Sequence, residues 1–231
     1  MGPVFRGAFA ALLLWVCAAP AAMAQVGPSP AEVAQFGALH AAAHRGDLAR
    51  LAAALAGAAP VNGRDSQGRT PLHAAAFARQ REAIRKLAAA GADLGALENE
   101  RYDAVTIAAV AGDEETLKVL LSLGASAKLT TSRYDGTALI AAAHLGHDGV
   151  VRQLIAAGAP LDHVNNLHWT AAIEAVVLGD GGPRHQATLR ALVDAGANLQ
   201  LADRSGQTPL QLARGRGYEA MVRMLETAPL R

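Results

Sequence analysis

Histidine is the side chain in this sequence best suited to acid–base or metal chemistry, and several histidines stand close together. His40 and His44 are four residues apart, so a helix would place both on one face, as two metal ligands require. His144 and His147 form a second close pair. No carboxylate stands between His40 and His44 at the position that metalloproteases use for their general base. We therefore interpret these histidines as structural and expect no metal site.

Motifs that mark common catalytic sites are missing from the sequence. It has no G-x-S-x-G elbow, no H-E-x-x-H pair and no G-x-x-x-x-G-K-[ST] loop. Glycines gather at residues 179–182, but no Lys-Ser or Lys-Thr pair follows, so we interpret this stretch as a flexible insertion. The sequence predicts no catalytic residue and no cofactor.

The N-terminus has the features of a secretory signal peptide over residues 1–24. Arg6 supplies a positive charge, residues 7–19 are apolar, and Ala22-Met23-Ala24 is a small-x-small cleavage site before Gln25. The apolar run is shorter than the roughly 20 residues of a spanning helix. Cys17, the single cysteine, would be removed with this segment, so the mature chain would have no disulfide and no thiol nucleophile. We expect export to the bacterial periplasm.

The charge of the chain is balanced, which limits the partners that it can attract. The formal net charge is +1, and Arg6 is the only charged side chain before residue 25. Removing residues 1–24 takes 21 basic residues to 20, against 20 acidic ones. A neutral balance gives no overall attraction to nucleic acid or to anionic membranes. We expect no nucleic-acid partner, no membrane insertion after cleavage, and a monomer.

The rest of the chain is an array of repeats. Residues 65–75 and residues 203–213 both follow the pattern D-x-x-G-x-T-P-L, and Gly-Ala pairs recur at residues 91, 124, 158 and 196. The glycine expected between the two helices of each unit falls at Gly46, Gly112, Gly146, Gly179 and Gly217, with Arg79 in its place once. These spacings predict a linker at 25–31 and then six units, at 32–64, 65–97, 98–130, 131–164, 165–202 and 203–231.

Each unit has the signals of two short helices. Thr70-Pro71 and Thr208-Pro209 suit a helix start, since Thr caps free N–H groups and Pro fits the first turn. A short Ala-rich helix follows, and then a helix with apolar residues at helical spacing. Examples of these apolar residues are Leu117, Leu120, Leu121, Val151, Leu154, Leu189 and Leu192. No unit can bury its apolar face alone, so neighbouring units must stack.

The motif D-x-x-G-x-T-P-L-H-x-A and the period of about 33 residues resemble the ankyrin repeat family. The resemblance covers everything after residue 31 and is closest to exported bacterial ankyrin repeat proteins. It implies an all-α solenoid of about six helix-turn-helix repeats with short β-hairpin fingers. It also implies a non-enzymatic scaffold that binds another protein. The alternative function is a small-molecule or metal-binding protein, or an enzyme, with its site in the concave groove.

The resemblance also implies which residues face a partner, because ankyrin proteins bind through their hairpin tips and the adjoining first helices. Arg-Tyr-Asp occurs in two consecutive hairpins, and His-Trp occurs in the next. Aromatic residues beside arginine are enriched at binding hot spots. The equally open interpretation is that each ring packs on its neighbour and stiffens the array. The predicted binding residues are Phe77, Arg101, Tyr102, Arg133, Tyr134, Asp135, His144, His168 and Trp169.

Overall fold

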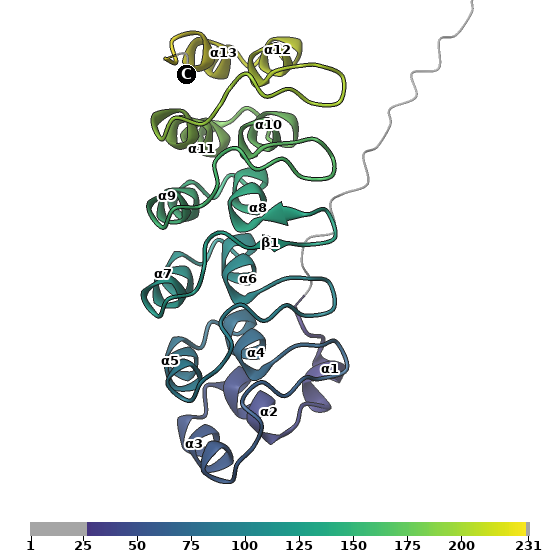
Figure 1. Ribbon diagram of the computed structural model, residues 1–231, viewed down its shortest axis with the longest axis vertical. Coiled ribbons are helices and arrows are strands. Elements are labelled where there is room, and N and C mark those ends of the chain that lie inside the picture. Colours follow the sequence, from purple (N-terminus) through teal and green to yellow (C-terminus); the bar gives the residue numbers. More distant parts are fainter. Residues whose placement is uncertain (1–26, 230–231) are drawn as a thin grey trace, which may run out of the picture.

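The computed structural model describes residues 27–229, which form thirteen helices and one pair of short strands. The predicted signal peptide, residues 1–24, lies outside this range. From the second helix onward, the helices form antiparallel pairs that stack along one long axis (Figure 1). The inner helices are α2 (Ala38–Arg45), α4 (Pro71–Phe77), α6 (Ala104–Val110), α8 (Ala138–His144), α10 (Ala171–Val177) and α12 (Pro209–Gly215). The outer helices are α3 (Leu48–Ala56), α5 (Arg81–Ala89), α7 (Glu114–Ser122), α9 (Asp148–Ala156), α11 (Pro183–Asp194) and α13 (Glu219–Glu226).

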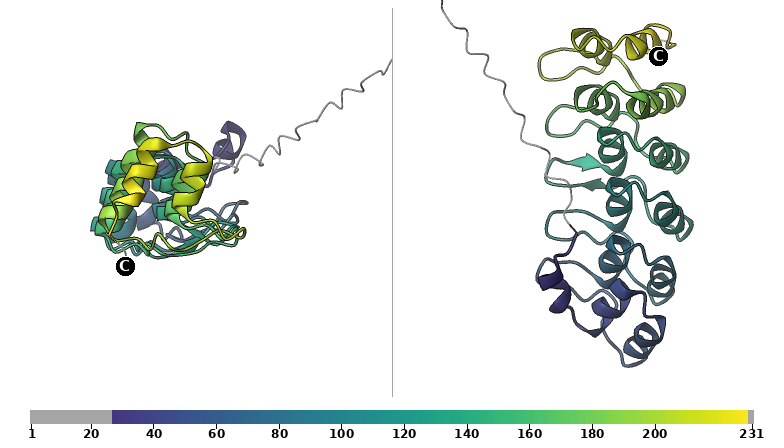
Figure 2. Two further views of the ribbon diagram at one scale, coloured as in Figure 1. Left: turned by 90° about the horizontal axis from the view of Figure 1, so that it is seen from above. Right: turned by 180° about the vertical axis from the view of Figure 1, so that it is seen from behind.

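This architecture confirms the predicted class of fold, a mostly helical repeat solenoid. The helices occupy two columns, and loops project from the inner column to one side (Figure 2). One loop contains the strands β1 (Thr130–Thr131) and β2 (Gly136–Thr137), which pair antiparallel. Among residues 27–229 the other projecting loops reverse direction through turns without paired strands. Of the predicted β-hairpin fingers, only the one at residues 130–137 contains paired strands within residues 27–229, and each of its strands has two residues.

The inner helices begin as the sequence predicts. Thr170 Oγ1 accepts a hydrogen bond from Ile173 N at 3.3 Å, which satisfies one of the free donors at the start of α10. At α4 the ring of His73 takes part as well. Its Nδ1 lies 3.0 Å from Thr70 N, and its Nε2 lies 3.1 Å from Tyr102 O in the next repeat. The interpretation of His73 as a structural histidine is confirmed.

The core lies between the two columns and runs the full length of the stack. Small alanines on the inner helices let neighbouring pairs approach closely, and larger aliphatic side chains from both columns fill the space between them. The largest side chains without exposure are Leu51, Leu72, Ile84, Leu87, Ile107, Leu117, Leu120, Leu139, Leu154, Ile173, Leu189 and Leu192. Each repeat buries its apolar face against the next, as a linear array requires.

The turn between the two helices of a repeat needs one residue with positive φ. Arg79 takes this conformation with φ of 57°, so it does replace the glycine of the other repeats. The fifth repeat differs from the prediction, because Gly181 and not Gly179 has the positive φ, at 69°. Gly179 is required for space instead, since a Cβ there would lie 2.2 Å from Ala175 O and 2.7 Å from the His185 ring.

The extra residues of the fifth repeat are ordered, which corrects the interpretation of a flexible insertion. They lengthen α11 at its start, so this helix has 12 residues where α9 has nine. Pro183 begins the helix, as its fixed φ favours. His185 Nε2 lies 3.0 Å from His144 O, and Arg184 donates to Gly146 O at 3.3 Å. The added turn therefore fastens repeat five onto repeat four.

A short helix that the sequence did not predict precedes the array. It is α1 (Pro30–Ala34), and it crosses the predicted boundary between the linker 25–31 and the first repeat. Ser29 caps it, and Glu32 Oε2 accepts a hydrogen bond from Ser29 N at 2.8 Å in return. The combination Ser-Pro-x-Glu is the local signal for this helix.

Candidate functional site

Five loops, called fingers, project from the inner helices and define one side of the molecule (Figure 1). They are finger one (63–69), finger two (96–102), finger three (130–136), finger four (163–169) and finger five (201–207). Side chains at the base of each turn fix its shape. Asp65 Oδ1 accepts from Arg69 N at 2.8 Å, and Asn165 Oδ1 accepts from Trp169 N at 3.0 Å.

Backbone bonds join the fingers into a row. Asn99 N donates to Gln67 O at 3.0 Å, which links finger two to finger one, and Asn166 N donates to Tyr134 O at 2.9 Å, which links finger four to finger three. Each of these asparagine side chains also donates to a carbonyl of the preceding finger. The row of fingers is thus held in place by the chain itself.

The two Arg-Tyr-Asp triplets occupy different registers in their fingers, although the sequence suggests that they are equivalent. Asp103 is buried and caps α6, with its Oδ1 accepting from Thr106 N at 2.8 Å. Asp135 is not a cap. It lies two residues before Thr137, which caps α8, and has a φ of 52°.

The aromatic side chains consequently do not form one row at equivalent positions. Tyr102 and Trp169 each lie directly before the N-cap of an inner helix. Tyr134 lies three residues before its cap, in the turn of finger three. The three aromatic residues are 32 and then 35 residues apart because Tyr134 stands two positions earlier relative to its cap, whereas the caps Asp103, Thr137 and Thr170 are 34 and 33 residues apart.

The charged residues of fingers two and three neutralise one another. Arg101 Nη1 lies 2.8 Å from Asp135 Oδ1, and both side chains are about half exposed. Arg133 forms a second ion pair with Glu100. A partner that binds these arginines through carboxylates has to compete with the ion pairs already present.

The two tyrosines lie close to this charged cluster and are half-buried. Tyr102 packs against the hydrophobic core, and burial raises the pKa of its hydroxyl, while the nearby Arg133 lowers it. The backbone N of Tyr134 donates to Ser132 Oγ at 3.2 Å within the turn. The packing of Tyr102 is the arrangement expected if the ring stiffens the array.

Finger four has a different surface, because its apolar side chains remain exposed. Val164 is 42% exposed and Leu167 is 36% exposed, and they are the exposed large hydrophobic residues of the stretch 27–229. Trp169 is half-buried beside them, and His168 is exposed with a φ of 64°. The exposed hydrophobic side chains lie within four residues of one another, as at a binding site.

A buried carboxylate that sequence reasoning missed lies at the base of finger four. Glu174 is 4% exposed within the apolar helix α10, and its Oε1 accepts from Asn165 Nδ2 at 3.1 Å. Its Oε2 lies 3.2 Å from Nδ1 of His144 on α8, without the geometry of a hydrogen bond. The sequence did contain a signal for this buried carboxylate, because Glu174 is the single acidic residue in a stretch of Ala, Ile and Val.

Phe77 does not stand free on the concave face. Gly27, which precedes α1, lies against its ring, since a Cβ on Gly27 would lie 3.4 Å from Phe77 Cδ1. Figure 2 shows α1 beside the inner helices, in the angle that they make with the fingers. The ion pair of Glu32 with Arg69, at 2.9 Å, fastens α1 to finger one. The N-terminal segment thus contacts the array at Phe77 and at finger one.

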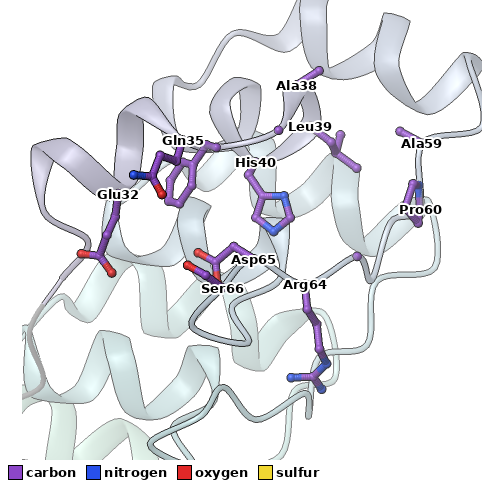
Figure 3. A pocket seen from close by; sticks show the side chains of 13 residues that line it. Glu32, Gln35, Ala38, Leu39, His40, Ala59, Pro60, Arg64, Asp65 and Ser66 are labelled. Carbon is purple, nitrogen blue, oxygen red and sulfur yellow. The ribbon is translucent and has the colours of Figure 1, made fainter.

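A cavity of about 410 Å³ lies at the N-terminal end of the stack, away from the predicted binding residues. Ala38, Leu39 and His40 line one side, and residues 59–60 and 63–66 line the other (Figure 3). Phe36 also lines the cavity. Within residues 27–229 there is no group of three or more His, Cys, Asp or Glu side chains that could hold a metal ion. None of the helices in that range is long and apolar enough to cross a membrane.

The stacked helix pairs, the row of fingers and the concave face define a repeat solenoid built for binding along its length. A family model described as ankyrin repeats (3 copies) matches residues 14–98 and 105–203. The chain belongs to the ankyrin repeat family. Its members generally serve as scaffolds for protein–protein interaction and not as enzymes.

Relatives in sequence and in structure agree with this assignment. The putative ankyrin repeat protein YahD of Escherichia coli (strain K12) is 32% identical over 188 residues, which are 81% of this chain and 93% of YahD. An ankyrin repeat domain from Acinetobacter baumannii AYE is 42% identical with a TM-score of 0.78, covering 84% of this chain and 98% of that domain. The ankyrin repeat domain of Bcl-3 is 26% identical with a TM-score of 0.75, covering 85% and 87%.

Proposed function

We propose that this protein is a non-enzymatic scaffold of the bacterial periplasm that binds another protein through finger four and the adjoining concave face. The exposed apolar surface of finger four carries the proposal. Val164 and Leu167 present aliphatic side chains to solvent beside Trp169. Tryptophan gives a large contact area at little entropic cost and is enriched at hot spots.

The chain's own contacts favour finger four over the other fingers as the binding site. The N-terminal segment contacts Phe77, and two ion pairs occupy the arginines of fingers two and three. Finger four keeps its apolar side chains uncovered. The bound partner would therefore contact finger four first, with Arg133, Tyr134 and His168 at the edge of the contact.

The proposed location rests on the sequence of the N-terminus. Residues 1–24 have a charged start, an apolar centre and a small-x-small end, in the order of a secretory signal. The relatives from Escherichia coli and Acinetobacter baumannii are bacterial proteins, which is consistent with a bacterial periplasm.

The alternative function, an enzyme or ligand-binding protein, would depend on the pair of His144 and Glu174. This pair joins a ring nitrogen and a carboxylate, the groups that acid–base chemistry uses. Neither residue lines the cavity described above, and Glu174 is nearly inaccessible. The exposed hydrophobic finger therefore favours the scaffold.

Affinity capture from periplasmic extract tests the proposal when matched surface variants are compared. Leu167→Asp places a charge in the exposed finger, and Lys118→Asp places one on the exposed side of α7 as the control. We expect one captured protein that Leu167→Asp loses and Lys118→Asp retains, with both variants folded by circular dichroism. Equal capture by the two variants would remove finger four from the binding site.

A further inference from the structure

The cavity at the N-terminal end lies where the finger of a preceding repeat would stack. Its upper wall comes from the end of α1 and the start of α2, and its lower wall comes from finger one and the loop before it (Figure 3). Fingers two, three and four each form a backbone hydrogen bond to the finger before them. The first repeat has no such neighbour within residues 27–229, because α1 lies against the inner helices instead.

The links between fingers show what this place would hold. In fingers two and four, the residue four positions before the N-cap is an asparagine, Asn99 or Asn166. Its backbone N donates to a carbonyl of the preceding finger, at 3.0 Å and 2.9 Å respectively. The equivalent residue of finger one is Ser66, which lines the cavity. Among the hydrogen bonds of residues 27–229, none has Ser66 N as its donor.

The charged groups in the walls are already paired, so they offer little to a charged small ligand. Glu32 and Asp65 both bind Arg69, at 2.9 Å and 2.8 Å. Arg64 donates to Gly68 O at 2.8 Å and to a second carbonyl.

What is left for recognition is a backbone donor at Ser66 and an apolar surface. Phe36, Leu39 and Pro60 supply this surface, and the cavity is of the size of ordinary ligand sites. A backbone donor beside an apolar wall is the pattern that recognises an extended polypeptide.

We propose that this cavity binds an extended segment of a partner protein, which takes the place of the missing finger. A carbonyl of the segment accepts the hydrogen bond from Ser66 N, and an aliphatic side chain packs against Phe36, Leu39 and Pro60. The site is separate from finger four, so it adds a second contact surface to the proposed scaffold.

A pair of substitutions at Ser66 isolates the backbone donor. Residues 65–68 form a turn closed by a bond of 3.0 Å from Gly68 N to Asp65 O, and Ser66 is its second residue. Proline suits that position, so Ser66→Pro removes the N–H while keeping the turn. Ser66→Ala keeps the N–H and removes only the hydroxyl. Melting curves of both variants verify that the array is intact.

The probe is a phage-displayed library of random octapeptides selected on the purified chain, with enriched peptides then synthesised. We expect their affinity to fall about tenfold on Ser66→Pro, as for loss of a buried hydrogen bond, and to stay within about twofold on Ser66→Ala. We also expect the peptides to move the amide resonance of Ser66 in the wild-type chain. Trp169→Ala should leave them bound, which separates this site from finger four.

Three results would overturn the proposal. They are peptides that bind Ser66→Pro as tightly as the wild type, peptides that Trp169→Ala releases, and a Ser66 amide resonance that stays unchanged at saturation. A selection that enriches no peptide would also count against it. None of these outcomes changes whether the Leu167→Asp variant loses the captured protein. The proposal for the cavity and the proposal for finger four can therefore fail independently.

Discussion

Arg101 and Asp135 bind each other across two fingers, with Nη1 of the guanidinium 2.8 Å from Oδ1 of the carboxylate. The first residue of one Arg-Tyr-Asp triplet thus pairs with the last residue of the other. The two Arg-Tyr-Asp triplets therefore supply the ion pair that joins neighbouring fingers. It does not present the same three side chains twice.

The ion pair should contribute little to stability. Both side chains are about half exposed, so solvent screens the attraction. A double-mutant cycle of Arg101→Ala and Asp135→Ala in urea should give a coupling of at most about 1 kcal/mol, and added salt should reduce it. A coupling well above that value, unchanged by salt, would contradict this description of the fingers.

Trp169 and Tyr102 should respond differently to replacement, although both lie directly before a helix cap. Trp169→Ala should weaken partner binding by about 2 kcal/mol, the loss typical of a hot spot, with a small effect on melting. Tyr102→Ala should lower the melting temperature, because its ring packs against the core.

Melting curves and affinities of the folded fraction, measured together, separate the two roles. If Trp169→Ala lowered only the melting temperature, this residue would stiffen the array in the way that we infer for Tyr102.

Buried positions of α7 should be far more sensitive to replacement than exposed positions of the same helix. Leu120 has no exposed surface, so Leu120→Ala should cost roughly 2–5 kcal/mol of unfolding free energy. Lys118 is exposed on the same helix α7, and Lys118→Ala should change the urea midpoint little. Equal midpoints for the two variants would contradict the helical register described above.

Acidification should destabilise the array through His73. Burial lowers the pKa of this ring from 6.5 to about 4 in the folded chain. As the pH falls below 6.5, the unfolded chain gains a proton that the folded chain does not, so the free energy of unfolding decreases until about pH 4. The loss across this window is about 3 kcal/mol.

Urea denaturation near neutral pH and again at acidic pH, for the wild type and for His73→Gln, measures this effect. The difference between the two chains removes the contribution of other titrating groups. A pH dependence that is the same in both would show that His73 takes up its proton without a cost to folding.

Export should release a chain that begins at Gln25. Mass spectrometry of the protein recovered from periplasm should show the loss of residues 1–24, and Cys17→Ser should be processed in the same way. A recovered mass that includes residues 1–24, or a lipid attached to Cys17, would contradict the signal-peptide prediction.

Periodic features of the sequence were sufficient to predict the helix pairs. Caps such as Thr170, and the apolar spacing of residues such as Leu117 and Leu120, depend only on local chemistry, which repeats in every unit. Even Arg79 could be placed correctly, because the residues on both sides of it keep the period.

The misjudged features depend on contacts between repeats. Gly179 looked like the turn residue until the packing of His185 against it showed why a glycine is needed there. The pairing of Arg101 with Asp135 and the approach of Glu174 to His144 join residues more than 25 positions apart. Nothing in a single repeat specifies such contacts, so the sequence pattern alone could not reveal them.

The fingers are unevenly fastened, and this has a mechanical consequence. Backbone bonds join fingers one to four, but among residues 27–229 fingers four and five are joined by the side chain of Arg204, which donates to Asn166 O at 2.5 Å. A side chain can swing aside at small cost, whereas a backbone bond resists shear. The array should therefore bend most easily just beyond finger four. Binding of a partner to finger four would therefore change the curvature of the solenoid between repeats five and six.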